Sequence, residues 1–499
     1  MEWRDSYYHE KKAYYFEAEG ELSKAIYHFG KLIENNSKNC INYYNRARIY
    51  IKKRNFDEAL KDLSVAVKLN PKYVDCYLLR ADVFCKINKY DKALGDMRQA
   101  IAIDPDDPEK YNEIGNIYCD IGDLAKAIIF YTKAIELDEG NNAYYNNRGL
   151  AYNQSSQYEL AISDFKRALS LKISGETYLN LGIVYGKTEN YEEGIRNISR
   201  AVSYMPDNAN CYFERAYLYN KEGILDKAIK DYTSAILIDP LFEDAYFNRA
   251  QCHTEQKSSK EAISDYSSVI KINPYSIDAY QFRGDLYYFA KEYKKAIKDY
   301  EKVIRIDPKL HIVFFNKGLA LVKLHKYTMA INDFSRAIKL KTDYKSAYLN
   351  RGIAYAKKKS YDKAIIDYSK ALEIDVRYSK AFYNRGNAFR KKKLYDKAIK
   401  DYARCIEMNS TDNLAFYGRG LCYFRKKQYS KAISDYNKAT LLDPSNGDVY
   451  YSKAKACERN GQVKEAIIAY NKYIRHSIVD KSFIKKIQKR IEYLKKIVE

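Results

Sequence analysis

The sequence predicts an all-α fold built from repeated helix-turn-helix units that stack along the whole chain. Three observations predict it. A period of 34 residues runs through nearly all of the 499 residues, each half-period carries apolar residues at helical spacing, and a proline recurs near the end of the period. Because no change in composition marks a linker, we expect one continuous array over residues 1–475 and a separate last helix over residues 476–499.

The period is set by a small residue in the first predicted helix of each unit. Successive copies lie 34 residues apart, except for one step of 33 between Gly149 and Gly182. The fourteen copies are Ala13, Ala47, Ala81, Gly115, Gly149, Gly182, Ala216, Ala250, Gly284, Gly318, Gly352, Gly386, Gly420 and Ala454. They predict about fourteen units of 34 residues.

Other positions recur in step with these small residues. An aromatic residue stands four positions earlier in thirteen units, and alanine stands twelve positions later in thirteen units. A small residue that faces a large ring on a neighbouring helix allows the two helices to pack closely. Seven of the eight prolines lie 24 positions after the small residue, where they end the second helix because proline cannot continue a helix interior.

This order of an aromatic residue, a small residue, alanine, a second aromatic residue and proline resembles the tetratricopeptide repeat, over roughly residues 6–475. The resemblance implies a right-handed α-solenoid, a superhelix whose first helices line a concave groove. It also implies a non-enzymatic scaffold, since members of this family mostly bind other proteins.

A pair of opposite charges recurs within the units. The residue before the small residue is Arg or Lys in ten units, and an Asp follows it sixteen positions later. The pairs are Arg46/Asp62, Arg80/Asp96, Arg148/Asp164, Arg215/Asp231, Arg249/Asp265, Arg283/Asp299, Lys317/Asp333, Arg351/Asp367, Arg385/Asp401 and Arg419/Asp435. Where the first residue is apolar, as at Ile114 and Leu181, the Asp is absent too. We therefore predict an ion pair between the two helices of one unit, because a charge beside the core needs a partner.

The last residues, 476–499, predict a basic amphipathic helix with Asp480 as its N-cap. Its apolar side carries Phe483, Ile487, Ile491 and Leu494, and lysines and arginines fill the rest. Such a helix can lie on a membrane surface. We favour a cap on the open end of the stack, which a repeat array needs for solubility.

Catalytic and metal-binding patterns are missing from the sequence. The six histidines show no metal-binding spacing and the nine cysteines form no close pair, so we expect no metal, no cofactor and no enzymatic activity. The string Leu181–Thr188 imitates a phosphate-binding loop, but it lacks the first glycine and lies in a predicted helix. Scattered thiols and the lack of a signal-like or membrane-spanning segment indicate a cytoplasmic protein.

A recurrent asparagine marks the predicted groove. It lies two positions before the small residue in half of the units, and a side-chain amide can both donate to and accept from the backbone of an extended peptide. The predicted groove residues are Asn45, Asn147, Asn180, Asn248, Asn316, Asn350, Asn384, Asn387 and Arg390. Local hydrogen bonding by these amides is the alternative interpretation.

The turns of units 10–13 carry the strongest run of positive charge. The residues of this basic ridge are Lys323, Lys326, Lys357, Lys358, Lys359, Lys391, Lys392, Lys393, Arg425, Lys426 and Lys427. Together with the net charge of +22, they favour anionic partners such as acidic peptides, nucleic acid or a charged surface. An ordinary solvated surface is the alternative reading of such lysine runs.

Two hypotheses about function follow. The favoured one is a scaffold for protein-protein interactions that binds extended or helical peptide segments in the groove. The other is a solenoid that binds RNA or an anionic surface through the basic ridge. A period of 34 rather than 35 residues, with no repeated base-reading pair, argues against the RNA hypothesis.

Overall fold

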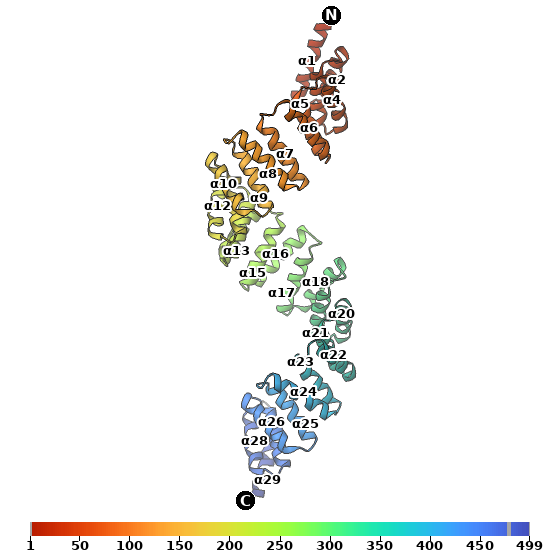
Figure 1. Ribbon diagram of the computed structural model, residues 1–499. Coiled ribbons are helices and arrows are strands. Elements are labelled where there is room, and N and C mark those ends of the chain that lie inside the picture. The colour runs from red at the N-terminus through yellow and green to blue at the C-terminus, as the bar shows by residue number, and fades with distance from the viewer. Residues whose placement is uncertain (1, 477–480, 499) are drawn as a thin grey trace. The chain divides into compact units, whose positions relative to one another are not determined.

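The computed structural model describes residues 2–476 and 481–498, where every regular element is a helix (Figure 1). The chain divides into two compact parts, Met1–Gln256 and Lys257–Glu499. The N-terminal part contains α1 (Glu2–Ala18), α2 (Leu22–Asn35), α3 (Cys40–Lys52), α4 (Phe56–Leu69), α5 (Val74–Lys86), α6 (Tyr90–Ile103), α7 (Pro108–Ile121), α8 (Leu124–Leu137), α9 (Asn142–Gln154), α10 (Tyr158–Leu171), α11 (Gly175–Lys187), α12 (Tyr191–Tyr204), α13 (Ala209–Lys221), α14 (Leu225–Ile238) and α15 (Glu243–Glu255).

The C-terminal part contains α16 (Ser259–Ile272), α17 (Ile277–Phe289), α18 (Tyr293–Ile306), α19 (His311–Lys323), α20 (Tyr327–Leu340), α21 (Lys345–Lys357), α22 (Tyr361–Ile374), α23 (Ser379–Lys391), α24 (Tyr395–Met408), α25 (Asn413–Arg425), α26 (Tyr429–Leu442), α27 (Gly447–Arg459), α28 (Val463–His476) and α29 (Lys481–Val498).

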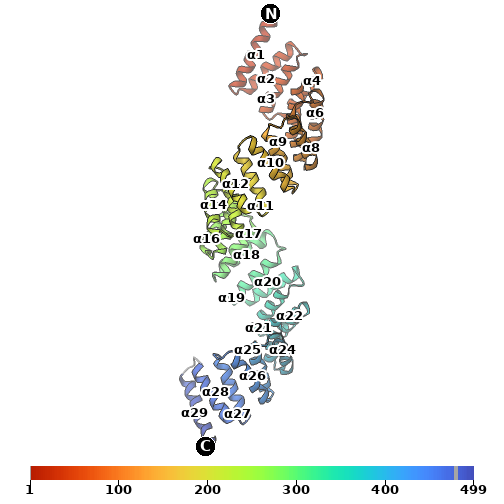
Figure 2. The same ribbon diagram turned by 60° about the vertical axis from the view of Figure 1, so that its left-hand side comes forward.

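Consecutive helices pack in pairs, and each pair packs against the next. Pairs α1/α2 to α13/α14 follow one another in the N-terminal part, and pairs α17/α18 to α27/α28 follow one another in the C-terminal part (Figure 2). In each part the even-numbered helix of one pair also contacts the odd-numbered helix of the following pair. The predicted all-α, helix-turn-helix architecture is therefore confirmed. The string Leu181–Thr188 continues α11 and its C-cap, as expected for a repeat helix.

A tyrosine on the even-numbered helix fills the centre of most pairs. Tyr232, Tyr266, Tyr300, Tyr368, Tyr402 and Tyr436 are among the largest fully buried side chains, and they share one position in the repeat. The ring of Tyr368 lies against Gly352, where an added Cβ would stand 2.6 Å from the Tyr368 Cε1 atom. The small residue of the odd-numbered helix thus receives the ring, as the sequence predicts, and this use of tyrosine explains much of its abundance.

The turn between the helices of a pair contains one residue in the left-handed conformation. In the part of the chain that the structure describes, this residue is glycine in four turns, and ten other turns place a non-glycine residue there at φ between 58° and 64°. In the turn between α21 and α22, the amides of Lys359 and Ser360 donate back to the carbonyls of Ala356 and Tyr355 at 2.9 Å. These bonds satisfy the last carbonyls of α21 and reverse the chain within a few residues.

The predicted ion pairs lie between the two helices of one pair. In Arg351/Asp367 the guanidinium donates from Nε and Nη2 to the two carboxylate oxygens at 2.8 and 2.7 Å. The same bidentate arrangement occurs in the pairs that begin with Arg46, Arg80, Arg148, Arg215, Arg283, Arg385 and Arg419. Lys317 contacts Asp333 at 3.2 Å. Burial of the carboxylates, such as Asp367 at 3% exposure, makes these pairs part of the core.

The last helix, α29, packs on the final pair. Ile487, Ile491 and Leu494 are buried with residues of α27 and α28, and the ring of Phe483 lies 5.8 Å from that of Tyr451. Arg490 also forms an ion pair with Glu458 of α27. The apolar side of α29 is thereby covered, which is the arrangement expected of a cap. The predicted N-cap, Asp480, lies outside the described residues.

Candidate functional site on the odd-numbered helices

Consecutive odd-numbered helices contact one another within each part and form a shared surface, which we call the odd-helix face. Hydrogen bonds join these helices from pair to pair. Asn147 Nδ2 on α9 donates to Asn112 Oδ1 on α7 at 2.9 Å, and Thr177 Oγ1 on α11 donates to Asn146 Oδ1 on α9 at 3.2 Å. The residues of the face lie two or three positions before the small residue and one, four or five positions after it, where the sequence predicts the groove.

The predicted groove asparagines fall into two groups. Several bridge adjacent odd-numbered helices: Asn45 Nδ2 donates to Tyr14 Oη at 2.9 Å, Asn180 Nδ2 to Asn146 Oδ1 at 3.5 Å, and Asn316 Nδ2 to Asp285 Oδ1 at 3.2 Å. Asn45 is buried, whereas the others are half-buried. Because these amides already hold neighbouring helices together, they order the face from one pair to the next.

The remaining groove residues interact within their own pair. Asn350 and Asn384 donate to backbone carbonyls four residues earlier, at 2.8 and 2.7 Å. Asn387 Oδ1 accepts from Tyr402 Oη at 2.9 Å and from Arg390 Nη2 at 3.2 Å, so the structure brings these two predicted residues together. Asn248 is half-buried on α15. A role of these amides in binding a peptide stays a prediction.

A cavity of about 490 Å³ opens on the odd-helix face between α5 and α7. Its lining includes the carboxylates of Asp82, Glu113 and Asp120, together with Cys85 and Lys110. Burial and the nearby Glu109 raise the pKa of Glu113 above its usual range, and burial raises the pKa of the Cys85 thiol to about 11. The cavity therefore offers carboxylates but no reactive thiolate.

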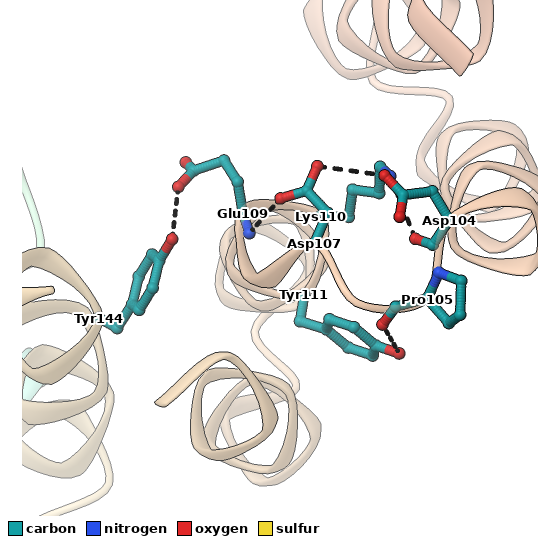
Figure 3. A network of polar contacts seen from close by, with 7 residues as sticks. All are labelled: Asp104, Pro105, Asp107, Glu109, Lys110, Tyr111 and Tyr144. Carbon is teal, nitrogen blue, oxygen red and sulfur yellow. Dashed lines mark hydrogen bonds and ion pairs between the residues drawn. The ribbon is translucent and has the colours of Figure 1, made fainter. Parts of the chain in front are cut away.

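The one lysine in the lining of this cavity is neutralised by its neighbours. Lys110 is 2% exposed, and its Nζ donates to Asp104 Oδ2 at 2.5 Å and lies 3.4 Å from Asp107 Oδ2 (Figure 3). Figure 3 also shows Tyr144 of α9 pointing toward Glu109, where its Oη donates to Oε2 at 2.9 Å. Lys110 thus stabilises the start of α7, and Asp82, Glu113 and Asp120 give the cavity its negative character.

A second, smaller cavity of about 150 Å³ lies between α17 and α19 on the same face of the C-terminal part. Asp285, Tyr288, Phe289, Tyr300, Asn316 and Leu319 line it. Of these residues the sequence analysis identified only Asn316 as a site residue. The signal for Asp285 was present in its position directly after Gly284, which is where Asn116 and Asn387 accept tyrosine hydroxyls in other units.

The basic ridge follows the turns between α19 and α26. Lys323, Lys357, Lys391 and Arg425 end their odd-numbered helices, where a cation is favoured by the helix dipole. Contacts also link each turn to the preceding pair: Lys358 Nζ donates to Thr328 Oγ1 at 2.8 Å, and Lys392 and Lys426 form ion pairs with Asp362 and Asp396. The other ridge residues are Lys326, Lys359, Lys393 and Lys427, all exposed.

Histidines and cysteines provide no further site. His9 and His28 come together from α1 and α2, with their Nδ1 atoms 2.8 Å apart. Within residues 2–476 and 481–498, however, no three His, Cys, Asp or Glu side chains gather as a metal site would require. No described helix combines the length and the apolar character needed to cross a membrane.

Sequence comparisons match most of the chain to one repeat family. Models of the tetratricopeptide repeat match residues 108–141, 143–172, 179–241, 243–276, 277–310, 346–378, 379–412, 414–446 and 447–475, and a model described as TPR repeat matches residues 81–118 and 318–359. Residues 18–99 match the model of subunit 3 of the anaphase-promoting complex, or cyclosome. No curated protein sequence matches the chain.

Solved structures of similar fold include three of different lengths. MamA is 26% identical over 32% of this chain and 94% of its own, with a TM-score of 0.32. YrrB, described as a TPR protein with an unusual peptide-binding site, is 24% identical over 38% of this chain and 97% of its own, with a TM-score of 0.35. The Cut9–Hcn1 hetero-tetramer of the anaphase-promoting complex gives 15% identity over 97% of this chain and 96% of that one, with a TM-score of 0.38.

Proposed function

Because the chain belongs to the tetratricopeptide repeat family, we propose that it is a non-enzymatic scaffold that binds extended or helical segments of partner proteins on its odd-helix face. The observation that carries this proposal is the face itself. Side chains on successive odd-numbered helices are hydrogen-bonded from pair to pair, as in Asn112–Asn147 and Asp285–Asn316, so the surface is ordered before a partner arrives. A preorganised surface loses less conformational entropy when it binds.

The two cavities support the same face as the binding surface. Each opens between neighbouring odd-numbered helices, and each presents carboxylates beside apolar or aromatic side chains. Such cavities can receive individual side chains of an extended segment while the hydrogen-bonding groups around them contact its backbone. The carboxylates favour basic side chains at these two places, whereas the acidic partners suggested by the net charge fit the ridge.

A pair of matched charge reversals tests the proposal. Glu113→Lys changes an exposed residue of the odd-helix face, and Lys359→Glu changes an exposed residue of the ridge. The full-length chain and both variants are used to capture partners from an extract of the source cells, after circular dichroism has established equal helix content. We expect Glu113→Lys to lose partners that Lys359→Glu retains. Retention of every partner by Glu113→Lys, with loss by Lys359→Glu, would reject the face in favour of the ridge.

The second candidate function is binding of RNA or another anionic surface through the basic ridge. The observation that favours it is the set of contacts between neighbouring turns, Thr328–Lys358, Asp362–Lys392 and Asp396–Lys426, which align the basic residues along the edge of the pairs. Two of these lysines are already neutralised by aspartates, which reduces the charge available to phosphates. Affinity for single-stranded RNA should fall steeply as salt rises if phosphates are bound. An affinity that does not change with salt would exclude this function.

A further inference from the structure

The smaller cavity on the odd-helix face contains a carboxylate without a cation. Asp285 lies on α17, is half-buried, and accepts hydrogen bonds from Tyr300 Oη at 2.5 Å and from Asn316 Nδ2 at 3.2 Å. Both bonds end on Oδ1, and both donors are neutral. In the part of the chain that the structure describes, no lysine, arginine or histidine lies within ion-pair distance of this carboxylate. Its second oxygen, Oδ2, has no hydrogen bond there.

This arrangement is unusual for the chain. The buried aspartates of the even-numbered helices, such as Asp299 in the adjoining α18, are held by bidentate arginines. At the positions equivalent to Asp285 that also receive a tyrosine hydroxyl, Asn116 and Asn387 provide a neutral amide oxygen instead. A neutral acceptor would therefore serve the structural role of binding the Tyr300 hydroxyl. The charge at Asp285 is an addition that the packing of the pair does not need.

Burial makes that charge costly in the free protein. It raises the pKa of Asp285 above the usual range for an aspartate, although the bonds from Tyr300 and Asn316 act in the opposite direction. A cation that entered the cavity would remove this cost, since an opposite charge within a few ångströms favours the ionised carboxylate.

Aromatic side chains form the rest of the cavity. Phe289 is 77% exposed, which is high for a large apolar residue, and its ring meets that of Tyr288 edge-on with centroids 5.8 Å apart. The buried Tyr300 contributes its hydroxyl end. Ammonium and guanidinium groups bind well between a carboxylate and aromatic rings, because both attract positive charge while the rings also pack against the aliphatic part of the side chain.

We propose that this cavity binds the side chain of a lysine or arginine from an extended partner segment, with Asp285 Oδ2 accepting from the cation and Phe289 and Tyr288 flanking its aliphatic stem. The inference rests on the proposed function, since it names the chemistry of one side-chain subsite on the odd-helix face. A volume of about 150 Å³ suits a single side chain and is too small for a drug-sized ligand.

The test compares two peptides that differ in charge alone. The probes are acetylated, amidated five-residue peptides with two alanines on each side of either lysine or norleucine, which keeps the apolar stem and lacks the ammonium group. Their affinities for the full-length chain are measured by isothermal titration calorimetry. We expect the lysine peptide to bind about tenfold more tightly than the norleucine peptide. The ratio should fall to about one in Asp285→Asn, which keeps an acceptor for Tyr300.

A matched variant controls for the loss of a negative charge. Asp278→Asn changes an exposed aspartate at the start of the same helix, and we expect it to keep the preference for lysine. Equal binding of the two peptides by the wild-type chain, or an undiminished preference in Asp285→Asn, would overturn the cation subsite while leaving peptide binding on the face intact. Failure of both peptides to bind the wild-type chain would contradict the subsite and the proposed function together.

Discussion

Arg351 and Asp367 form a bidentate ion pair between α21 and α22, and Arg351 also reaches the preceding pair, where Nη1 donates to Ser335 Oγ of α20 at 3.0 Å. The serine or threonine stands sixteen positions before the arginine, as the aspartate stands sixteen positions after it. Equivalent bonds run from Arg148 to Thr132 and from Arg283 to Ser267. Each such arginine therefore joins the two helices of its pair and links that pair to its neighbour.

We predict that Arg351→Ala destabilises the C-terminal part by about 3–5 kcal/mol, because it leaves the buried Asp367 carboxylate without its partner. Ser335→Ala should cost only about 1 kcal/mol, since it removes one hydrogen bond at the edge of the same cluster. Urea unfolding followed by circular dichroism measures both. Lys339→Ala, an exposed change on the same helix as Ser335, serves as the control. An unchanged unfolding curve for Arg351→Ala would mean that the ion pair does not stabilise the fold.

Lys359→Gly should stabilise the chain by about 0.5–1 kcal/mol. Lys359 adopts φ 62° in the turn after α21, and a side chain in this region crowds the backbone, whereas glycine does not. Gly122 and Gly223 occupy the same position in other turns. Thermal unfolding measures the effect, with Lys357→Gly as the control, since Lys357 ends the helix and glycine there should lower the melting temperature. A lower melting temperature for Lys359→Gly would contradict this account of the turn.

Asp285→Asn should raise the stability of the free chain at neutral pH by about 1 kcal/mol, because it removes a partly buried charge that has no cation. The folded state raises the pKa of Asp285, so its contribution to stability is present at acid pH and is lost as pH rises through the folded-state pKa. The gain from the variant should therefore shrink as the pH is lowered. Urea unfolding at neutral and acid pH measures it, and a loss of stability at neutral pH would show that the ionised carboxylate is needed for folding.

The first pair should loosen as the pH falls. Burial, together with His9 and Lys12, lowers the pKa of His28, so the stability that depends on the neutral His28 ring is present at neutral pH and is lost as pH falls through that lowered pKa. One of the two Nδ1 atoms in the His9–His28 contact must also remain an acceptor. Hydrogen exchange should report lower protection factors for α1 and α2 at acid pH. His28→Phe should abolish this pH dependence, and persistence of the dependence would assign it to another group.

Much of the fold could be predicted because the repeat provides many copies of the same information. The spacing of the small residues predicts the helix pairs, and the joint variation of residues such as Arg351 and Asp367 predicts which helices their ion pair joins. The left-handed turn residue was missed, although Gly20, Gly122, Gly223 and Gly461 mark it at a constant offset. Ten other units have non-glycine residues there, so composition alone gave a weak signal.

The candidate site was less predictable, since it depends on how neighbouring pairs meet. The sequence identifies Asn147 and Asn316 as residues of the odd-helix face, but it does not indicate that their amides are already bonded to Asn112 and Asp285. The cavities arise from side-chain shape at the contacts between α5 and α7 and between α17 and α19. Such local volumes cannot be obtained from a repeat pattern, because the pattern describes what the units share and the cavities occur where they differ.

Site-specific photo-crosslinking tests most directly whether partners bind the odd-helix face. A benzophenone amino acid replaces either Leu319, which lines the cavity between α17 and α19, or Lys339, which is exposed on α20. The full-length chains are irradiated with their co-purifying partners, and the adducts are mapped by mass spectrometry. The proposal predicts adducts to partner segments from position 319 and none from position 339. Adducts from position 339 alone would contradict it.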